Sequence, residues 1–461
     1  MRHPKIVILG AGSLFFGRKA IWQMVHSPHL QQGTLALVDT DPARLAKMKA
    51  LAEKVAAHHD VPLRINASTD RRQLLPDADF VILSFARDNA RYRGIDCELS
   101  AKYGIRMCSG DTIGPGGVLR AMREFPEIIR AARDIEELCP EAWVINYINP
   151  AAVHGMGLAR FFPKLKSFAI CDAQYELRQK YAEMAGLIEK GASLPPQIDR
   201  DLDLQSVGPN HFTWVLHFEH AGRDLRPALL ETIHQRAQVE KDAEEADLIY
   251  RGSKGVFNLD IQYQLATAFG AIPTVVGHTK EYVRFYQGHG VTSEEIPPLQ
   301  LFDPAERANW TANVWQRVDD YLSGAAPIAE FDTEFGPDPA TDIIESMWAG
   351  LAKRFFINQP NRGAVPNMAD DAYLELYSDL DMSGPRPLPT LPIPRGIRGM
   401  MEVILDTHEL TAEAIYHEDR HLLRRALLTD PLTNSIGDTD ALLAELISAE
   451  RDALPRQWQH Q

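Results

Sequence analysis

The sequence predicts an α/β protein with an N-terminal doubly wound parallel sheet of the Rossmann type and a mixed, helix-rich C-terminal part. Short apolar runs rich in β-branched residues recur along the first 200 residues and are typical of strands buried on both faces. Stretches with helical spacing separate these runs. The first run ends in a glycine-rich turn, as in folds that bind a dinucleotide.

The elements follow in a regular order. The expected strands cover residues 6–9, 34–38, 79–84, 143–147 and 167–170. The expected helices between and after them cover residues 14–26, 42–57, 118–138 and 175–187. Beyond residue 200 the pattern is mixed, with helical spacing at 228–249, 305–323 and 397–416 and a proline-rich loop at 385–394. Strand–helix alternation followed by a helix-rich part indicates two large units.

Composition narrows the classes of partner. The 461 residues include 48 Lys and Arg against 63 Asp and Glu, which gives a formal net charge of −15 and argues against nucleic acid as a partner. The four cysteines are too few for a disulfide framework and form no CxxC pair. No apolar run reaches the roughly 18 residues of a membrane span, and glycines interrupt the N-terminal run. We therefore expect no membrane partner and a cytoplasmic location.

A glycine-rich turn follows the first expected strand. Gly10 would permit a tight turn, and Gly12 would let the backbone approach a pyrophosphate at the start of the next helix. Asp39 ends the second strand, where a carboxylate accepts hydrogen bonds from a ribose 2′-hydroxyl and repels a 2′-phosphate, which favours NAD over NADP. The alternative is a Rossmann fold with a structural turn and no nucleotide. The residues expected to contact NAD are Gly10, Gly12, Ser13, Leu14, Phe15 and Asp39.

Two candidate metal ligands follow later strands. Cys171 comes directly after the strand expected at 167–170, at the edge where doubly wound sheets place their ligands. His211 lies forty residues further on, beside Asn210. By spacing alone these residues do not define a metal site, because a buried cysteine and a core or capping histidine would give the same pattern.

Several motifs together resemble glycoside hydrolase family 4. They are Gly10-Ala11-Gly12-Ser13, Gly110-Asp111-Thr112-Ile113-Gly114-Pro115-Gly116-Gly117, Asn149-Pro150, Cys171-Asp172, Asn210-His211, Phe269-Gly270-Ala271-Ile272-Pro273 and Asn361-Arg362-Gly363-Ala364-Val365. Each is modest alone, but their order and spacing extend over nearly the whole chain. The stretch around Asp111 is most similar to the α-galactosidase and α-galacturonidase branches.

The resemblance implies a redox-neutral hydrolysis that departs from the usual two-carboxylate scheme. In that family NAD oxidises C3 of the sugar, which acidifies the C2 proton, and a divalent metal, usually manganese, binds O2 and O3 and stabilises the enediolate. The C1–oxygen bond then breaks by elimination, water adds, and the hydride returns. The implied substrate is a small α-glycoside such as a galactoside, a galacturonide or glucuronide, or another anionic sugar.

The resemblance also implies roles for single residues. Cys171, as the thiolate, and His211 would be the metal ligands. Asn149 and Asn210 would contact the substrate. Asp111, or Asp172 as a second candidate, would assist the leaving group.

Two positions depart from the family pattern. Asp172 follows the metal-binding cysteine, as in the 6-phospho-α-glucosidase branch, where the α-galactosidase branch carries histidine. The position of the C2 base falls on Gln264, and a neutral amide cannot remove a proton. We expect the neighbouring Tyr263 to act as the base, although Asp260 and His278 also lie close in sequence.

Arginines after the strand at 79–84 form a further candidate site. Arg87, Arg91 and Arg93 could bind a carboxylate or phosphate of an anionic sugar, or could form a solvated basic surface. We expect Arg87 and Arg91 to contact the substrate.

Two other functions stay open. A hydroxy-acid dehydrogenase of the lactate/malate type would share the predicted fold but leave Cys171 and His211 without a role. A non-catalytic NAD- or sugar-binding relative would explain Gln264. For the leading prediction we place an NAD-binding domain at residues 1–200 and a substrate-binding, metal-binding and oligomerisation domain at 201–461. The family resemblance suggests a homodimer or homotetramer.

Overall fold

The computed structural model describes residues 2–13, 16–242, 258–287 and 302–459. Its parallel strands are β1 (Lys5–Leu9), β2 (Thr34–Val38), β3 (Arg64–Ser68), β4 (Phe80–Leu83), β5 (Trp143–Asn146) and β6 (Lys166–Ala169). They pair in the order β3-β2-β1-β4-β5-β6, which is the strand order of doubly wound dinucleotide-binding folds. The predicted fold class is confirmed. β3 escapes sequence prediction because it is an edge strand with no buried residue.

An antiparallel half continues the same sheet. It contains β7 (Leu202–Gly208), β8 (Trp214–His220), β9 (Arg223–Asp224), β10 (Ile272–Pro273), β11 (Arg354–Pro360), β12 (Tyr373–Asp381) and β13 (Gly384–Pro387). β11 joins β6 through the pair Asn358 and Ala169, and β12, β7, β8 and β10 follow in turn. β13 lies at the start of the stretch predicted as a proline-rich loop, where Pro385 and Pro387 pair on the outer edge of β12. The sheet thus crosses residue 200 without a break, and the predicted domain division there stays a prediction.

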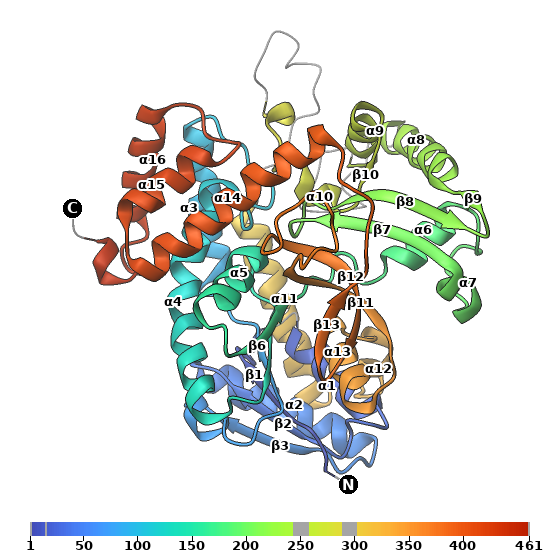
Figure 1. Cartoon of the computed structure of the whole chain (residues 1–461). Helices are drawn as coiled ribbons and strands as arrows, with labels where there is room; N and C mark the ends of the chain where they lie inside the picture. Colours follow the sequence, from blue (N-terminus) through green and yellow to red (C-terminus); the bar gives the residue numbers. More distant parts are fainter. Residues whose placement is uncertain (1, 14–15, 243–257, 288–301, 460–461) are drawn as a thin grey trace.

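Helices cover both faces of the parallel half (Figure 1). On one face lie α1 (Phe16–His26), α2 (Pro42–His58), α11 (Pro304–Ser323), α12 (Glu330–Glu334) and α13 (Pro339–Ala349). On the other lie α3 (Asn89–Lys102), α4 (Gly114–Leu138), α5 (Ala151–Phe161), α14 (Arg395–His417), α15 (Arg420–Thr429) and α16 (Ile436–Ala449). The remaining α-helices are α6 (Leu177–Met184), α7 (Pro196–Asp201), α8 (Arg226–Asp242), α9 (Asn258–Phe269) and α10 (Val276–Thr279).

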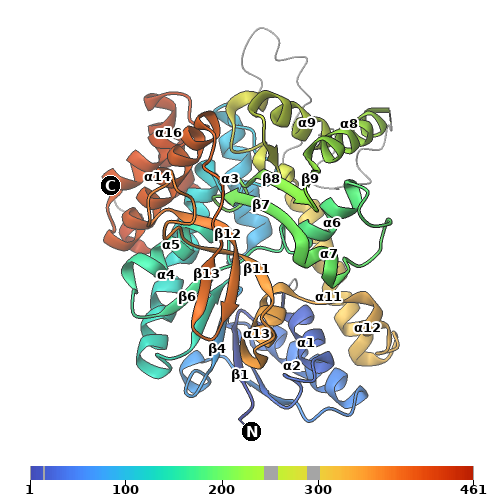
Figure 2. The ribbon, with the colours of Figure 1, turned by 45° about the vertical axis from the view of Figure 1, so that its right-hand side comes forward.

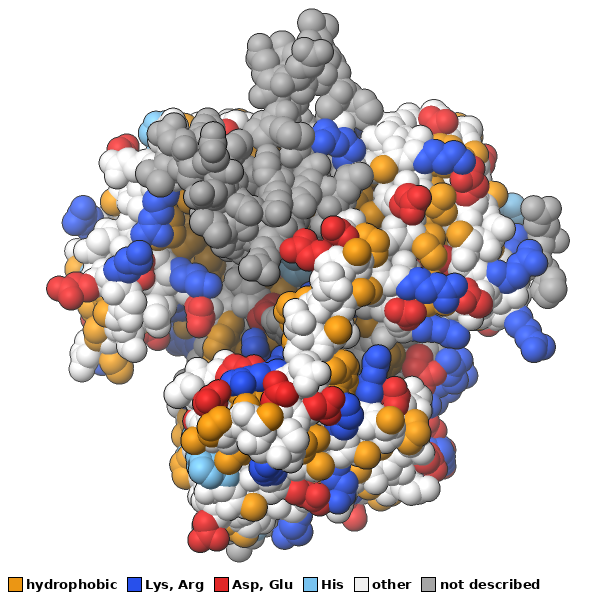
Figure 3. Space-filling model, turned by 180° about the vertical axis from the view of Figure 1, so that it is seen from behind, with side chains coloured by type: hydrophobic (Ala, Val, Ile, Leu, Met, Phe, Trp, Pro, Cys, Tyr) orange, Lys and Arg blue, Asp and Glu red, His pale blue; other side chains and the backbone are white. Residues whose placement is uncertain are grey.

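The views in Figures 1 and 2 show α8 and α9 over the antiparallel half, where Leu229 and Ile233 pack against Val215 and Phe218. Charged side chains of both signs are interspersed over the described part of the face that Figure 3 shows. No described helix is both long enough and apolar enough to cross a bilayer.

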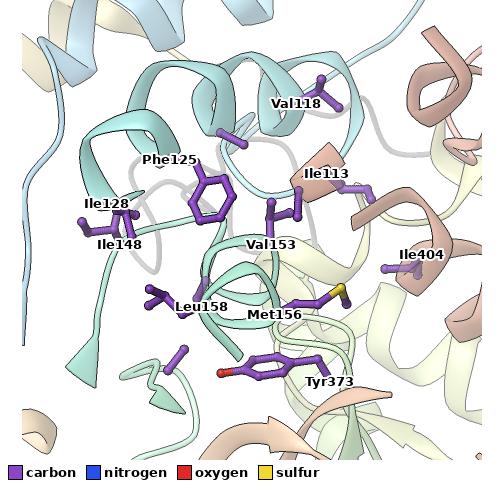
Figure 4. Packing of buried hydrophobic residues seen from close by; sticks show 14 of the residues in the cluster. Ile113, Val118, Phe125, Ile128, Ile148, Val153, Met156, Leu158, Tyr373 and Ile404 are labelled. Atoms are coloured by element: carbon purple, nitrogen blue, oxygen red, sulfur yellow. The ribbon is translucent and has the colours of Figure 1, made fainter. Parts of the chain in front are cut away.

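Helix α5 lies in close contact with its neighbours on both sides (Figure 4). A Cβ atom at Gly157 would overlap the ring of Phe125 on α4, and one at Gly155 would overlap the ring of Tyr373 on β12. The two glycines therefore let one helix approach another helix and the sheet at once. This packing fixes the start of α5, where Asn149 and Pro150 lead into the helix.

A buried charged triad ties the C-terminal helices to the N-terminal unit. The Arg123 guanidinium on α4 lies 2.7 Å from the Asp96 carboxylate and 2.5 Å from the Glu450 carboxylate. Burial, and then the neighbouring charge of Asp96, raise the pKa of Glu450 to about 9, although Arg123 opposes the shift. One proton is therefore held between the two carboxyl groups at neutral pH.

We expect Glu450→Gln to flatten the pH dependence of stability. Because the folded chain binds the Glu450 proton more tightly than the unfolded chain, this contribution is complete below pH ~4.5 and is lost as the pH rises towards ~9, at up to about 1.4 kcal/mol per pH unit. Urea unfolding from pH 5 to pH 9 measures it. The control is Glu445→Gln, which removes an exposed pair with Lys102. Parallel profiles for wild type and Glu450→Gln would contradict the assignment.

Candidate active site

The predicted nucleotide turn lies between β1 and α1. Gly10 has φ = +94°, and the backbone N–H of Gly12 donates to Asp39 Oδ2 over 2.7 Å. A Cβ atom at Gly12 would lie 2.8 Å from the same oxygen, so glycine is required there for Asp39 to close on the turn. The N–H of Ser13 donates to the carbonyl of Gly10 over 2.8 Å. Leu14 and Phe15 lie outside the described residues.

Cys171 and His211 meet across the sheet. Cys171 follows β6 and His211 follows β7, and Cys171 Sγ lies 3.0 Å from His211 Nε2. The sheet register explains the meeting, because one row of paired residues runs from Ala169 through β11 and β12 to Gly208. His211 adopts φ = +66°, which turns its side chain back towards the end of β6. A thiol and an imidazole at this distance are the donor types that a divalent transition metal prefers.

A buried carboxyl group supports this pair from the sheet. Glu375 is fully buried on β12, and Asn210 Nδ2 donates to its Oε2 over 3.3 Å. Burial raises the pKa of Glu375 to about 7, against the hydrogen bonds of Gln174, Asn210 and Asn358. The carboxyl group thereby holds Asn210 in place beside His211.

His278 of α10 stacks on His211. The ring centroids are 3.9 Å apart at an interplanar angle of 14°. Burial, and then the neighbouring His278, hold the pKa of His211 well below its ordinary value, and burial lowers the pKa of His278 to about 4. Both imidazoles are therefore neutral at pH 7, the state in which a histidine nitrogen can bind a metal. The Nδ1 atoms of both rings are buried with no hydrogen-bond partner among the residues that the structure describes.

Asp111 lies in a cluster of arginines. Its Oδ2 is 2.7 Å from Arg120 Nη1 and 3.7 Å from Arg93 Nη1, and Asn149 Nδ2 donates to it over 3.5 Å. Burial alone would raise the pKa of Asp111, but Arg93 and Arg120 outweigh it and hold the pKa below its ordinary value. Asp111 is therefore a carboxylate at all ordinary pH values and can accept hydrogen bonds.

The backbone of the loop that carries Asp111 is held by a buried carboxyl group, that of Glu281. Fully buried Glu281 accepts hydrogen bonds from the backbone N–H groups of Ser109 and Gly110. Gly110 has φ = +65°, and a Cβ atom there would overlap Cys97 Sγ. Glycine and Glu281 together hold the loop so that Asp111 lies near His211 and His278, which would lower its pKa further if they were protonated.

Comparison with known proteins decides the family. The family model described as "Family 4 glycosyl hydrolase" matches residues 5–187, and the model of that family's C-terminal domain matches residues 206–433. The chain belongs to glycosyl hydrolase family 4. The predicted resemblance is confirmed, and so is the prediction of a hydrolase that acts on glycosidic bonds.

Family 4 relatives match over their full lengths. The α-galactosidase of Bacillus subtilis (strain 168) is 26% identical over 459 residues, which cover 98% of this chain and 99% of the relative. The α-galacturonidase of Lachnoclostridium phytofermentans is 25% identical over 472 residues, with 98% and 97% covered.

Solved structures share the fold. A 6-phospho-α-glucosidase from gut microorganisms in complex with NAD and Mn²⁺ superimposes with a TM-score of 0.81 at 22% identity, over 98% of this chain and 99% of that one. A malate dehydrogenase of Cryptosporidium parvum has a TM-score of 0.51 at 10% identity, over 90% and 100% of the chains. The predicted likeness to the lactate/malate dehydrogenase architecture is confirmed for the fold.

The structure brings most of the predicted family 4 residues together. Cys171 contacts His211, which adjoins Asn210, and Asn149 contacts Asp111, which lies near enough to His211 for the ring to influence its pKa. Asp172 adjoins the group at the surface, with its Oδ1 3.9 Å from Cys171 Sγ, and desolvation by the surrounding protein raises its pKa.

Three other predicted residues point elsewhere. Arg87 donates to the backbone carbonyl of Asp452 over 3.0 Å, and Arg91 pairs with the Asp452 side chain over 3.0 Å. Tyr263 on α9 packs against the His234 ring with a centroid distance of 4.2 Å. Their roles in substrate binding and proton removal stay predictions. Gln264 hydrogen-bonds Asp260 over 2.9 Å.

Sequence reasoning missed several residues of this region. Arg120, Arg307, Glu281 and Glu375 lie outside every motif used above, although Arg120 follows Gly117 by only three residues. The one available signal was charge at apolar positions, because Arg120 and Glu375 interrupt buried stretches of α4 and β12. Buried charges of this kind persist only where partners compensate them.

We expect Asp111→Asn to lower the free energy of unfolding by about 3 kcal/mol, because two buried guanidinium groups would then face a neutral amide. Urea denaturation with intrinsic fluorescence measures this loss. Asp452→Asn is the matched control, since it breaks the exposed pair with Arg91 and should change stability little. Equal effects of the two substitutions would show that the Asp111 pairs contribute no more than surface pairs.

Proposed function

We propose that this chain is an NAD- and divalent-metal-dependent glycosidase that cleaves a small anionic α-glycoside. The observation that carries the proposal is the pair Cys171 and His211 at 3.0 Å in a family 4 chain whose β1–α1 turn is closed by Asp39. When bound, NAD would accept a hydride from C3 of the sugar and return it, and manganese would bind O2 and O3 and make the C2 proton acidic.

The residues present fit both groups. The two glycines and Asp39 suit a pyrophosphate and a ribose diol at the start of α1. For the metal, a thiol and a neutral imidazole face one another. Without a metal, burial and then Asp172 hold the pKa of Cys171 well above its ordinary value, so metal binding would displace the thiol proton. His278 would act as a positioning residue that keeps His211 neutral and fixes its ring plane.

The two aspartates suit different roles. Asp172 is exposed beside Cys171, and the upward direction of its pKa shift suits a donor to the leaving oxygen. Asp111 is held ionised by its arginines, so it suits an acceptor of a hydroxyl hydrogen bond. We therefore assign leaving-group assistance to Asp172 and substrate orientation to Asp111. Tyr263 stays the sequence-based prediction for the C2 base, and its packing against the His234 ring does not support that role.

An anionic sugar is favoured by the charge around Asp111. Burial, and then the positive charge of Arg93, lower the pKa of Arg307, with Arg120 adding to the effect and Asp111 opposing it. Arg307 forms no ion pair within the described part of the chain; its guanidinium lies over the Trp310 ring at 4.7 Å. A carboxylate or phosphate on the substrate would relieve this mutual repulsion. The names of the galacturonidase relative and of the phosphoglucosidase neighbour agree with this class.

The two alternative functions differ from the proposed one in the products that would form. A hydroxy-acid dehydrogenase would accumulate NADH, whereas the proposed hydrolysis returns every hydride and leaves the NADH concentration unchanged. A non-catalytic relative would bind NAD and metal but hydrolyse nothing. The cytoplasmic location and the dimeric or tetrameric assembly stay predictions.

We expect hydrolysis of at least one nitrophenyl α-galactoside, α-uronide or 6-phospho-α-glycoside, dependent on both NAD and manganese and without NADH accumulation. Cys171→Ser should lower kcat/KM by on the order of 100-fold or more through weaker metal binding. Nitrophenol release and absorbance at the NADH maximum are followed together, with each cofactor omitted in turn.

The matched control is Cys139→Ser, a buried cysteine at the C-terminal end of α4. It should retain activity. NADH formation on a hydroxy acid with no glycoside cleaved would overturn the proposal in favour of the dehydrogenase. Cleavage that is independent of manganese would exclude the metal role of Cys171.

We expect Arg307→Met to raise KM for an anionic glycoside by about tenfold, as for loss of one charge-assisted hydrogen bond, and to leave KM for the neutral analogue unchanged. Steady-state kinetics on a uronide and on the corresponding neutral glycoside measure the difference. Arg317→Met on the same helix is the control, because Arg317 pairs with Glu330 and Glu334. An equal loss on both substrates would argue against an anion subsite.

A further inference from the structure

Three metal-ligating side chains meet on the helical layer of the N-terminal unit. His26 is the last residue of α1, His59 is the C-cap of α2, and Asp332 lies in α12. One ligand atom from each lies within 4.8 Å of the others, and within the described ranges no other group of three His, Cys, Asp or Glu side chains meets this condition. Both ribbon views show α12 beside α1 and α2 (Figures 1 and 2).

This cluster is separate from the candidate active site. The nucleotide turn precedes the first residue of α1, whereas His26 is the last of its 11 residues, about 15 Å further along the helix axis. Neither Cys171 nor His211 contacts the three residues. The inference below therefore does not rest on the proposed function.

The hydrogen bonds fix which nitrogen of His26 is available. His26 Nδ1 lies 2.8 Å from the backbone carbonyl of Trp22, and a carbonyl can only accept, so Nδ1 carries the proton. The Trp22 indole stacks on the same ring at 4.2 Å and fixes its plane. In the neutral ring, Nε2 then presents a lone pair to Asp332 Oδ1 at 3.4 Å. Two acceptors at this distance need a cation between them or a proton on one of them.

The second histidine completes the arrangement. His59 Nε2 lies 2.9 Å from the same Asp332 oxygen. Ligands of one tetrahedral zinc ion, with bonds of about 2.0–2.1 Å, lie about 3.3 Å apart, which the two distances to Asp332 approach, while the three ligand atoms all lie within 4.8 Å of one another. A backbone carbonyl behind the ligating histidine is the usual second partner in such sites. The side chains of all three residues are about a quarter exposed, which leaves a path for the ion and for water as a further ligand.

We propose that His26, His59 and Asp332 bind a divalent transition-metal ion of the zinc type, with water completing the coordination. The ion would join the C-terminal ends of α1 and α2 to α12, more than 270 residues away in sequence. Existing contacts already bring α12 to this place, since Arg18 pairs with Glu334 over 3.2 Å and Trp22 donates to the Asp332 carbonyl over 3.2 Å. The metal would then stabilise the packing of α12 on the nucleotide-binding unit.

The test separates this site from the one at Cys171. All variants are made in a Cys171→Ser/His211→Asn background, stripped with EDTA, so that only the new site remains. Zinc is titrated by calorimetry, and thermal unfolding is recorded with and without zinc. We expect one zinc ion per chain and a zinc-dependent rise in Tm. His59→Gln and Asp332→Asn should each weaken zinc binding by at least about tenfold and remove the rise in Tm.

The matched control is His58→Gln, which changes the exposed neighbour of His59 and should leave zinc binding and the Tm rise intact. Absence of zinc binding in the background chain would overturn the proposal. It would equally be overturned if His59→Gln lowered Tm by the same amount with and without zinc, because the cluster would then be an imidazolium–carboxylate ion pair only. Zinc binding retained in both His59→Gln and Asp332→Asn would also overturn the proposal.

Discussion

The candidate site depends on the antiparallel addition of β11 to β6. Through the pair Asn358 and Ala169 the parallel sheet continues into β12 and β7, and one row of residues connects the end of β6 with the end of β7. Cys171 and His211 follow these two ends, so their approach to 3.0 Å is a consequence of strand register. A shift of one residue would turn the side chains of a strand to its other face and separate the pair.

Burial then sets the chemistry of the assembled groups. Desolvation keeps His211 and His278 neutral and raises the pKa of Glu375 to about 7. Asp111 is buried as well, but two guanidinium groups keep it ionised. One region thus combines neutral imidazoles, a protonatable carboxyl group and a fixed carboxylate. Neighbouring groups with different pKa values can hold and release protons at the same pH, which acid–base chemistry requires.

Single charged contacts also join parts of the chain that are distant in sequence. Arg123 binds Glu450 from the C-terminal helices, Glu281 holds the loop of Asp111, and Asp332 meets the ends of α1 and α2. Each connection buries or partly buries charge, which costs free energy unless the partner is present. The N-terminal unit therefore carries its ligand turn by itself, whereas the region around Asp111 needs residues from both halves of the chain.

The sequence by itself determined the parallel half of the fold, the nucleotide turn and the family. Buried parallel strands leave continuous apolar runs, and tight turns leave glycines, so local patterns suffice for both. The sequence did not predict edge strand β3 or the antiparallel strands β11 and β12, because polar or mixed residues occupy them and form no continuous apolar run. Only the tertiary structure decided that Arg93 rather than Arg87 or Arg91 reaches Asp111, that His278 stacks on His211, and that Glu375 lies beneath Asn210. These contacts join residues that local sequence patterns cannot relate, since strand register and helix packing alone set the distances between them.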